Sequence, residues 1–520
     1  MPSLSQISSL VPLAMRALSQ SGMGIDTPVM GYNSYNDVLC SPTGAHMSET
    51  IDALVSRGFR DAGYKFFQID CGWQSLNGTR GSINSFGAID YDQQNFPQGI
   101  RPISDKARQN GFTFSMYSDA GVRSCDTIVP SKRLGSYGHE AADAKQFADW
   151  NVEYVKYDYC YPDSPDPSNN APKDPRSDFV DRYRTMWNAL QSNKIYRMLV
   201  CQWGTPFRSS SGNLQGPSQW TDPVSTSFRL SDDINKDWAA VTRIINQSIH
   251  IANSGITGKG HFADADMLEV GAKELTIDEQ ASHFAYWAMA KSALMIGSNV
   301  ASMPDASLRI LQNKALIAIN QDALAKPVKL VQRWTGDRDL FRGPLQNGDE
   351  AVLLLNLRNQ ARNDLSIDLA KSLGIRSATI ENLWTGQKKT GAMGVYSVGS
   401  LGARGSAPLR LSNIQRIATP NVEVIWSEAE SASLSGGASS ASCSGCSGGT
   451  KVGNVGNGGA VTFKNVVAKS TTSTLLFDYI NADIGYLAGQ GQNARSLSIS
   501  VNGAAAQNVD SAHQRIRLER

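Results

Sequence analysis

An aspartate that follows a lysine is the pair of residues in this sequence best suited to chemistry. The apolar run at 154–160 contains Asp158, two residues after Lys156. A lysine so placed keeps a carboxylate ionised by its opposite charge, and an ionised carboxylate can attack an electrophilic carbon. A salt bridge at the rim of a barrel would use the same two residues, so the local sequence leaves both interpretations open.

A second pair of carboxylates follows further along the chain. Asp232 and Asp233 end the run at 228–234, and Arg229 precedes Asp233 by four residues. Adjacent side chains on a strand point to opposite faces, so only one of the two aspartates can face a pocket.

Both pairs lie in a region where short β-rich runs alternate with helical patterns. From about residue 30 to 320 the alternation is typical of parallel strands joined by crossover helices. Helical spacing occurs, for example, at 49–62 and 139–150. Eight strands in this length predict a (β/α)8 TIM barrel. The predicted strands are 29–33, 65–70, 113–118, 153–158, 197–202, 227–232, 260–264 and 292–296.

Aspartates stand at the C-terminal ends of several predicted strands. Loops from all eight strands of a (β/α)8 barrel converge at that face, where the active site of the fold lies. We therefore expect a pocket rimmed by carboxylates. The residues are Asp70, Asp119, Asp158, Asp232 or Asp233, and Asp264 or Asp266.

The pattern changes after residue 322. Short alternating strands, such as 351–357 and 378–383, predict a small antiparallel β-sandwich domain. Gly, Ser and Ala dominate 431–459, a composition that also suits a flexible linker, but strand-like runs follow it. We divide the chain into an N-terminal segment (1–24), a catalytic barrel (25–322), an antiparallel β domain (323–420) and a partial β-sandwich module (424–520).

Charge and hydropathy narrow the range of partners. Lys and Arg total 49 against 47 for Asp and Glu, and a net charge of +2 gives no electrostatic reason to bind nucleic acid or an anionic membrane. No run of 18 apolar residues occurs, which argues against a membrane-spanning helix. The weakly apolar stretch at 10–18 lacks a basic start and a cleavage site, so it is not a clear signal peptide. A neutral partner fits best.

Cysteine count and sequons bear on the compartment. The seven cysteines are an odd number, so at least one is unpaired unless it bonds to another chain. Glycosylation sequons at Asn77 and Asn246 favour a secretory route, although motifs this short also arise by chance.

Eight ordered motifs resemble those of glycoside hydrolase family 27, which contains the α-galactosidases and α-N-acetylgalactosaminidases. The resemblance implies a retaining exo-glycosidase that needs no cofactor for catalysis, acts on galactose-containing oligosaccharides or polysaccharides, and is secreted. It covers roughly residues 25–420, too much for chance. The motifs are MGYNSYN (30–36), IDCGW (69–73), YSDAG (117–121), KYDYC (156–160), CQW (201–203), FRLSDDI (228–234), DADML (264–268) and AINQD (318–322).

The resemblance assigns roles residue by residue, with Asp158 as the nucleophile and Asp233 as the acid/base. A retaining pair stands about 5 to 5.5 Å apart, one carboxyl ionised and the other protonated. Lys156 is expected to hold Asp158 charged, while burial and the negative neighbour keep the proton on Asp233. The expected sugar-binding or orienting residues are Tyr35, Asp70, Cys71, Tyr117, Lys156, Gln202, Arg229 and Asp266.

Three positions depart from the usual pattern of the family. Cys71 stands where the family has a second aspartate that grips O4 and O6 of the sugar. Gln202 replaces a glutamate that contacts O2, although its amide can still hydrogen-bond a hydroxyl. Tyr35 replaces a tryptophan of the aromatic wall. The sugar is therefore left open between α-D-galactose, β-L-arabinopyranose and α-N-acetylgalactosamine, and a non-catalytic sugar-binding protein is the remaining alternative.

By the same resemblance, Cys125 pairs with Cys160, and Cys40 pairs with Cys71 unless Cys71 lines the pocket. Cys201 is then the odd thiol. Its simplest interpretation is a buried and inert cysteine.

The tail resembles the start of a family 35 carbohydrate-binding module, in the runs WSEAE (426–430) and GGTKVG (448–453). In such modules early glutamates, here Glu428 and Glu430, help to hold a structural calcium, a hard cation that prefers oxygen ligands. The residues that follow lack the last strands of such a sandwich. We therefore expect a truncated module with an unpaired edge and poor ordering.

Overall fold

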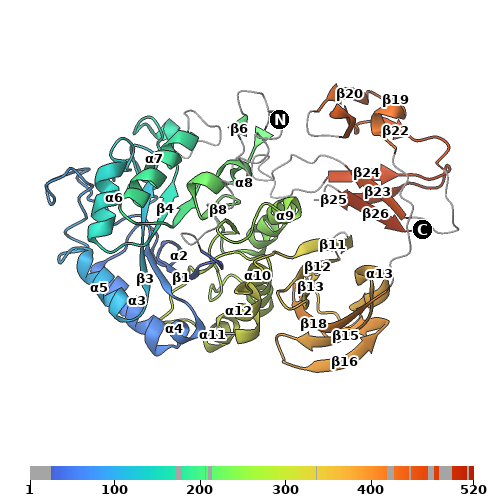
Figure 1. The fold of residues 1–520 in the computed structure, drawn as a ribbon, viewed down its shortest axis with the longest axis horizontal. Helices are drawn as coiled ribbons and strands as arrows, with labels where there is room; N and C mark the ends of the chain where they lie inside the picture. Colours follow the sequence, from blue (N-terminus) through green and yellow to red (C-terminus); the bar gives the residue numbers. More distant parts are fainter. Residues whose placement is uncertain are drawn as a thin grey trace, which may run out of the picture. The chain divides into compact units, whose positions relative to one another are not determined.

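A closed ring of eight parallel strands forms the first part of the protein. The computed structural model describes residues 25–170, 179–204, 207–208, 214–334, 337–417, 427–443, 447–466, 474–478, 495–511 and 515–519. The strand order is β10-β1-β2-β3-β4-β5-β8-β9, and a parallel bridge between Leu268 and Ile296 joins the two ends of the sheet. All eight predicted strands are present, so the expected barrel is confirmed (Figure 1). They are β1 (Met30–Asn33), β2 (Phe66–Ile69), β3 (Thr113–Asp119), β4 (Tyr154–Asp158), β5 (Met198–Val200), β8 (Ser227–Arg229), β9 (Phe262–Asp264) and β10 (Leu294–Ile296).

Strand β4 shows how the sequence places chemistry at one end of this barrel. All its residues are buried, as expected for a parallel strand covered on both faces. Val155 and Tyr157 pack in the outer core, while Tyr154 and Lys156 line a cavity inside the barrel. The two-residue period of a strand then brings Asp158 to the same inner face, at the C-terminal end.

Helices surround the ring, and one of them differs from the prediction. The helical pattern at 49–62 is two helices, because α3 stops at Ser56 and the backbone of Gly58 adopts a φ of 78°. Glycine takes this left-handed conformation at little cost, which allows the turn into α4. The helices are α2 (Tyr35–Val38), α3 (Gly44–Ser56), α4 (Phe59–Ala62), α5 (Arg101–Gln109), α6 (Glu140–Asp149), α7 (Phe179–Ser192), α8 (Pro217–Trp220), α9 (Trp238–Ser254), α10 (Ile277–Met289), α11 (Asp305–Leu311) and α12 (Lys314–Asn320); the short strands β6 (Phe207–Arg208) and β7 (Leu214–Gln215) pair between β5 and β8.

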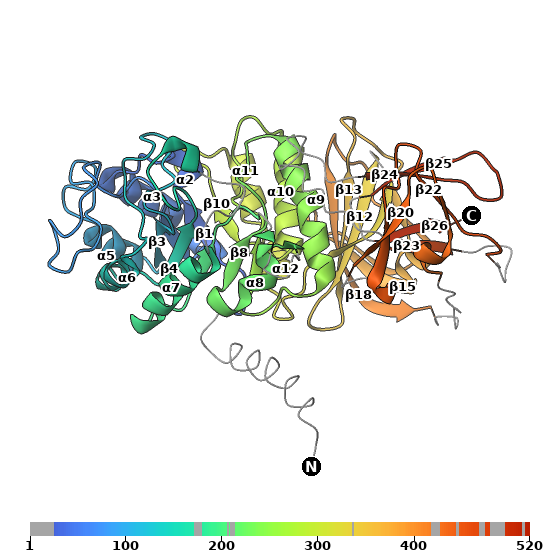
Figure 2. The same ribbon diagram turned by 90° about the horizontal axis from the view of Figure 1, so that it is seen from above.

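The predicted antiparallel domain follows the barrel and packs against it. Six strands form one antiparallel sheet in the order β11-β12-β13-β18-β15-β16, and β14 pairs with β17. Helices α9 and α10 stand between the barrel strands and this sheet (Figure 2), and Phe341 and Leu353 share the buried cluster of the barrel. The elements are β11 (Lys329–Trp334), β12 (Arg338–Pro344), β13 (Glu350–Asn356), β14 (Ser366–Asp368), α13 (Leu369–Leu373), β15 (Ile375–Asn382), β16 (Lys388–Met393), β17 (Val395–Ser397) and β18 (Ser406–Arg416).

The described strands of the tail lie in antiparallel pairs. Residues 416–479 and 515–520 form a separate unit. From residue 427 on, each described strand pairs with one other described strand, and the family 35 type sandwich stays a prediction. The strands are β19 (Ser433–Ser435) with β22 (Ala460–Thr462), β20 (Ser439–Ser442) with β21 (Thr450–Gly453), β23 (Thr474–Asp478) with β26 (Arg515–Glu519), and β24 (Arg495–Ile499) with β25 (Gln507–Ser511).

Candidate active site

Lys156 joins two carboxylates at the C-terminal ends of β2 and β4. Its Nζ lies 3.0 Å from Oδ2 of Asp70 and 3.9 Å from Oδ2 of Asp158. All three residues are buried, so the pairs are poorly screened by water. Asn33, at the end of β1, donates a hydrogen bond from Nδ2 to Oδ2 of Asp70 at 2.8 Å. Asn33 had no predicted role, although it lies in one of the quoted motifs.

Arg229 joins a second pair of carboxylates. Its Nη2 lies 2.9 Å from Oδ1 of Asp233 and 3.0 Å from Oδ2 of Asp266. The backbone N–H of Ile234 donates to the same oxygen of Asp266 at 2.7 Å. Arg229 is buried, whereas 54% of the Asp233 side chain is exposed. The acid/base candidate therefore stands at the mouth of the site and the nucleophile candidate lies deeper.

Of the two adjacent aspartates, Asp233 is the one in the site. Asp232 pairs instead with Arg243 of α9, whose Nη2 also donates to the backbone oxygen of Asp233 at 3.2 Å. The two neighbours thus face different arginines, as the rule for adjacent side chains predicts.

Trp203 is a contact of Asp158 to which the sequence analysis gave no role. Its Nε1 donates to Oδ1 of Asp158 at 3.1 Å, and the backbone N–H of Tyr159 donates to the same oxygen at 3.0 Å. Cys201 is fully buried, and its Sγ accepts a hydrogen bond from Nη1 of Arg229 at 3.6 Å. The odd thiol therefore lies beside Arg229, in a segment that the sequence indicated only through the CQW motif.

Two tyrosines face Lys156, as expected for members of the site. Its Nζ lies 5.6 Å from the ring centre of Tyr35 and 5.4 Å from that of Tyr117, within range of a cation–π attraction. Tyr35 is partly exposed. Tyr117 is fully buried, and its hydroxyl donates to Asp119 at 3.3 Å and accepts from the backbone N–H of Cys125 at 3.1 Å. Only the Tyr35 ring is therefore open to a ligand.

Gln202 is not brought to the catalytic carboxylates. It is fully buried, and neither its Oε1 nor its Nε2 has a hydrogen-bond partner among the described residues. Strand β5 ends at Val200, so the following residues no longer obey the alternation of a strand. Cys201 and Trp203, on either side of Gln202, contact Arg229 and Asp158, and the expected contact of Gln202 with O2 of the sugar stays a prediction.

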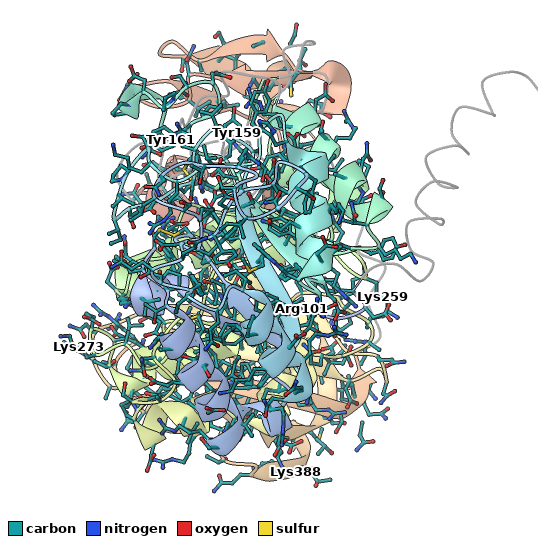
Figure 3. All side chains as sticks on the ribbon, turned by 90° about the vertical axis from the view of Figure 1, so that its left-hand side faces the viewer. Arg101, Tyr159, Tyr161, Lys259, Lys273 and Lys388 are labelled. Carbon is teal, nitrogen blue, oxygen red and sulfur yellow. A yellow bond between two sulfur atoms is a disulfide. The ribbon has the colours of Figure 1, made fainter. Side chains whose placement is uncertain are left out.

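Both expected disulfides are present. Cys40–Cys71 joins the loops after β1 and β2, and Cys125–Cys160 joins those after β3 and β4. Cys71 is therefore a bridge partner and no free thiol, and with Cys40 it packs against Tyr117. Cys160 lies between the buried residues Tyr159 and Tyr161, which Figure 3 labels.

Burial and neighbouring charges shift the pKa values of the two carboxyls in opposite directions. Burial raises the pKa of Asp158 to about 6, against the opposing effect of Lys156. Burial also opposes ionisation of Asp233, but Arg229 and Lys156 outweigh it, and the pKa of Asp233 lies below its ordinary value. The two carboxyls are coupled, so they titrate as a pair. Arg229 contacts Asp233 directly, which favours its ionised form, so the roles of Asp158 as nucleophile and Asp233 as acid/base stay predictions.

The two sequons differ in the folded protein. Asn77 is exposed in a loop. Asn246 is half-buried in α9, its Oδ1 accepts a hydrogen bond from Arg333, and Ser248 of the same sequon is buried. A glycan at Asn246 would have to displace these contacts, so Asn77 is the better acceptor.

Possible cation ligands come together at one place in the described part of the chain. Among the described residues, the one close group of three acidic or sulfur ligands is Asp119 with Cys125 and Cys160, whose sulfurs are joined to each other. The calcium expected at Glu428 and Glu430 stays a prediction. None of the described helices has the length and hydropathy needed to cross a bilayer.

Two family models match the chain. The model described as alpha galactosidase A matches residues 36–322, and the model of the alpha galactosidase C-terminal beta sandwich domain matches residues 335–411. Relatives include a probable α-galactosidase D of Aspergillus niger, 34% identical over 79% of this chain, and α-galactosidase D of Emericella nidulans, 32% identical over 71%. The matches cover 60% and 54% of those proteins, so the chain spans less than two thirds of their length.

Solved structures give the same answer for the fold. α-Galactosidase I of Mortierella vinacea superposes with a TM-score of 0.66 at 27% identity, covering 76% of this chain and 99% of its own. The Saccharomyces cerevisiae α-galactosidase solved with raffinose gives 0.64 at 26% identity, covering 75% and 98%. A β-L-arabinopyranosidase of Geobacillus stearothermophilus, 18% identical over 74% and 97% of the two chains, shares the fold with a TM-score of 0.60.

Proposed function

We propose, from the premise that this chain belongs to the α-galactosidase A family, glycoside hydrolase family 27, that it is a retaining exo-glycosidase. It would release terminal α-D-galactosyl residues from oligosaccharides or galactomannan, with Asp158 as the nucleophile and Asp233 as the acid/base. The raffinose bound to the yeast relative supports an oligosaccharide substrate.

The reaction follows from the positions of the two aspartates. The ionised Asp158 attacks the anomeric carbon while Asp233 passes a proton to the leaving oxygen, which leaves a galactosyl ester on Asp158. Asp233, now ionised, takes a proton from water, and that water displaces Asp158 with a second inversion. Trp203 and the backbone of Tyr159 hold the attacking carboxylate in place through their hydrogen bonds. Carboxyl groups and water suffice for this scheme, so no cofactor is needed.

The observation that carries the proposal is the pair of charge clusters at the strand ends. Lys156 bridges Asp70 and Asp158, and Arg229 bridges Asp233 and Asp266. A protein that only binds sugar needs no carboxyl pair of this kind. Two cationic supports, one under each carboxyl, favour catalysis over the lectin alternative.

The identity of the sugar is the weaker half of the proposal. Cys71, bonded to Cys40, offers no carboxylate to O4 or O6, and the buried amide of Gln202 bonds to neither aspartate. A β-L-arabinopyranosidase or an α-N-acetylgalactosaminidase is therefore the alternative reading of the same machinery.

A panel of nitrophenyl glycosides tests the substrate. We expect release of nitrophenol from the α-D-galactoside, with less than about a tenth of that rate, a difference of roughly 1.4 kcal/mol in the barrier, from the β-L-arabinopyranoside and the α-N-acetylgalactosaminide. Faster release from either of the other two would transfer the proposal to that sugar. If none of the three is cleaved, the proposed activity is wrong.

The pH dependence follows from the coupled pair. Between the lowered pKa of Asp233 and the value of about 6 for Asp158 the pair holds one proton, and the reaction needs one carboxyl of each kind. As the pH rises through about 6 the last proton leaves and no acid remains, and at low pH both carboxyls are protonated and no nucleophile remains. We expect a bell-shaped profile of kcat/KM with its maximum below pH 6. Initial rates on an aryl glycoside measure it, and a rate that stays constant up to pH 8 would contradict it.

Three further features complete the proposal. Two disulfides fit an oxidising compartment and support secretion. The runs around Glu428 and Glu430 support a family 35 type carbohydrate-binding segment in the tail. These two glutamates would contribute oxygen ligands to its calcium.

A further inference from the structure

Glu269 is a buried carboxyl to which the reaction above gives no role. It follows Leu268, whose bridge to Ile296 closes the barrel. Its exposed fraction is 0%, and its Oε2 has no hydrogen-bond partner among the described residues. A carboxyl in this condition costs folding free energy, so a contribution to stability does not account for it.

Asn36 of helix α2 connects Glu269 to the loop that contains Lys236. Nδ2 of Asn36 donates a hydrogen bond to Oε1 of Glu269. The carbonyl oxygen of Asn36 accepts one from Nζ of Lys236 at 2.8 Å. Lys236 comes three residues after Asp233, and Glu269 comes three residues after Asp266. Asn36 is thus tied to the loops of both residues that pair with Arg229.

The element that contains Asn36 also carries the aromatic wall. Helix α2 begins at Tyr35 and has only four residues. One helical turn is not stable by itself, so contacts with other elements decide where the ring of Tyr35 stands. Oδ2 of Asp37, in the same helix, lies 2.7 Å from the hydroxyl of Tyr32 and 2.9 Å from Nε2 of His46. Glu269 and Lys236 provide further contacts through Asn36.

The surroundings hold the Glu269 carboxyl in one position. A Cβ on Gly297 would lie 3.1 Å from Oε1 of Glu269 and 3.1 Å from Cβ of Asn36, so a side chain there would crowd both. The backbone N–H of Glu269 donates to Nε2 of His283 at 3.0 Å.

We propose that Glu269 is a positioning residue for sugar binding, which holds the Tyr35 wall in register with the Asp233 loop through Asn36. The inference rests on the proposed glycosidase function. It assigns Glu269 no contact with the substrate.

At the acidic working pH this carboxyl is an uncharged acid. Burial raises the pKa of Glu269 to about 7, with Lys236 opposing and with Asp266 and Glu274 adding to the rise. His283 of α10 is neutral there, because burial lowers its pKa to about 3. Since the pKa is raised in the folded state, the stability linked to this proton is lost as the pH rises through about 7.

Two substitutions and one control test the proposal. Glu269→Gln keeps the size and an acceptor for Asn36 but cannot ionise, while Glu269→Leu removes the acceptor. Glu279→Gln is the control, because Glu279 is a buried glutamate whose bonds go to Thr276, at the start of α10, and to Arg404, not to Asn36 or Lys236. At pH 5, Glu269→Leu should raise KM about tenfold with a smaller change in kcat, as expected for the loss of one buried hydrogen bond. Glu269→Gln should stay within about twofold of the wild-type KM, and Glu279→Gln should lower Tm without changing KM.

The readouts separate this inference from the proposed activity. KM is measured with the nitrophenyl glycoside that the wild type cleaves fastest. If the wild type cleaves none of them, the proposed activity is wrong. Sugar binding is then measured instead, as the rise in Tm caused by free D-galactose or L-arabinose. If Glu269→Leu has the same KM as the wild type, or shows the same rise in Tm with sugar, the proposal is overturned and Glu269 is a structural residue. The Tm of the wild type should also fall more steeply from pH 6 to 8 than that of Glu269→Gln. Equal slopes would overturn the role of the uncharged acid.

Discussion

Replacing Asp158 by asparagine should lower kcat on an aryl α-galactoside roughly 10⁴-fold or more, because the amide cannot form the ester on which the scheme depends. The fold should survive the change. Lys156 keeps Asp70 as its partner. Moreover, the pKa of Asp158 is raised to about 6, so its ionised form reduces stability above that pH.

Steady-state rates and thermal melts at pH 7.5 check the Asp158→Asn prediction. We expect a Tm equal to or above that of the wild type, since asparagine carries no buried charge. The control is Asp61→Asn, because Asp61 of α4 is an exposed aspartate that pairs with Arg60, and its loss should keep activity within about twofold, the scatter of surface substitutions. Appreciable cleavage by Asp158→Asn would show that the nucleophile is another residue.

Replacing Asp233 by asparagine should have an effect that depends on the leaving group. A general acid contributes about 10²- to 10⁴-fold where the leaving oxygen needs a proton, so raffinose should lose most of its rate. Nitrophenolate, the leaving group of a nitrophenyl glycoside, departs without protonation. The variant should therefore form the glycosyl ester much faster from this substrate than from raffinose. Slow attack by water on the ester then limits turnover.

Pre-steady-state mixing measures the two steps of Asp233→Asn separately. We expect a burst of nitrophenol followed by a slow steady rate, and acceleration of that rate by azide, a small nucleophile that needs no general base. Equal losses on raffinose and on the nitrophenyl glycoside, with no burst, would assign the acid role elsewhere. Arg229 keeps Asp266 as a partner in the variant, so the substitution does not leave this buried arginine unpaired.

What could be predicted from the sequence was what depends on local geometry. The alternation within 154–158 was enough to place Lys156 and Asp158 on one face of a strand. The directions of the side chains after Val200 could not be predicted in this way. Strand β5 ends there, and the backbone of Trp203 adopts a φ of 51°. The indole of Trp203 reaches Asp158 from this segment, a contact that the sequence pattern did not indicate.

The protonation of the pair lay beyond the sequence for a different reason. It depends on charges at the ends of β2, β4 and β8 and on α9, and Lys156, Arg229 and Asp70 all contribute to it. No pattern within a single motif encodes their combined effect. The break of the predicted helix at 49–62 was missed, although Gly58 stands at the position where the structure divides it.

The two disulfides divide the rim of the barrel into unequal halves. Their four cysteines lie in the loops after β1, β2, β3 and β4, so covalent cross-links span the half that carries Asp158. In the described part of the other half, the loop of Asp233 is held by ion pairs, hydrogen bonds and the packing of Ile234, without a disulfide. The strand end of Asp158 is therefore constrained by covalent bonds in its neighbouring loops, whereas the loop of Asp233 is constrained only by non-covalent contacts.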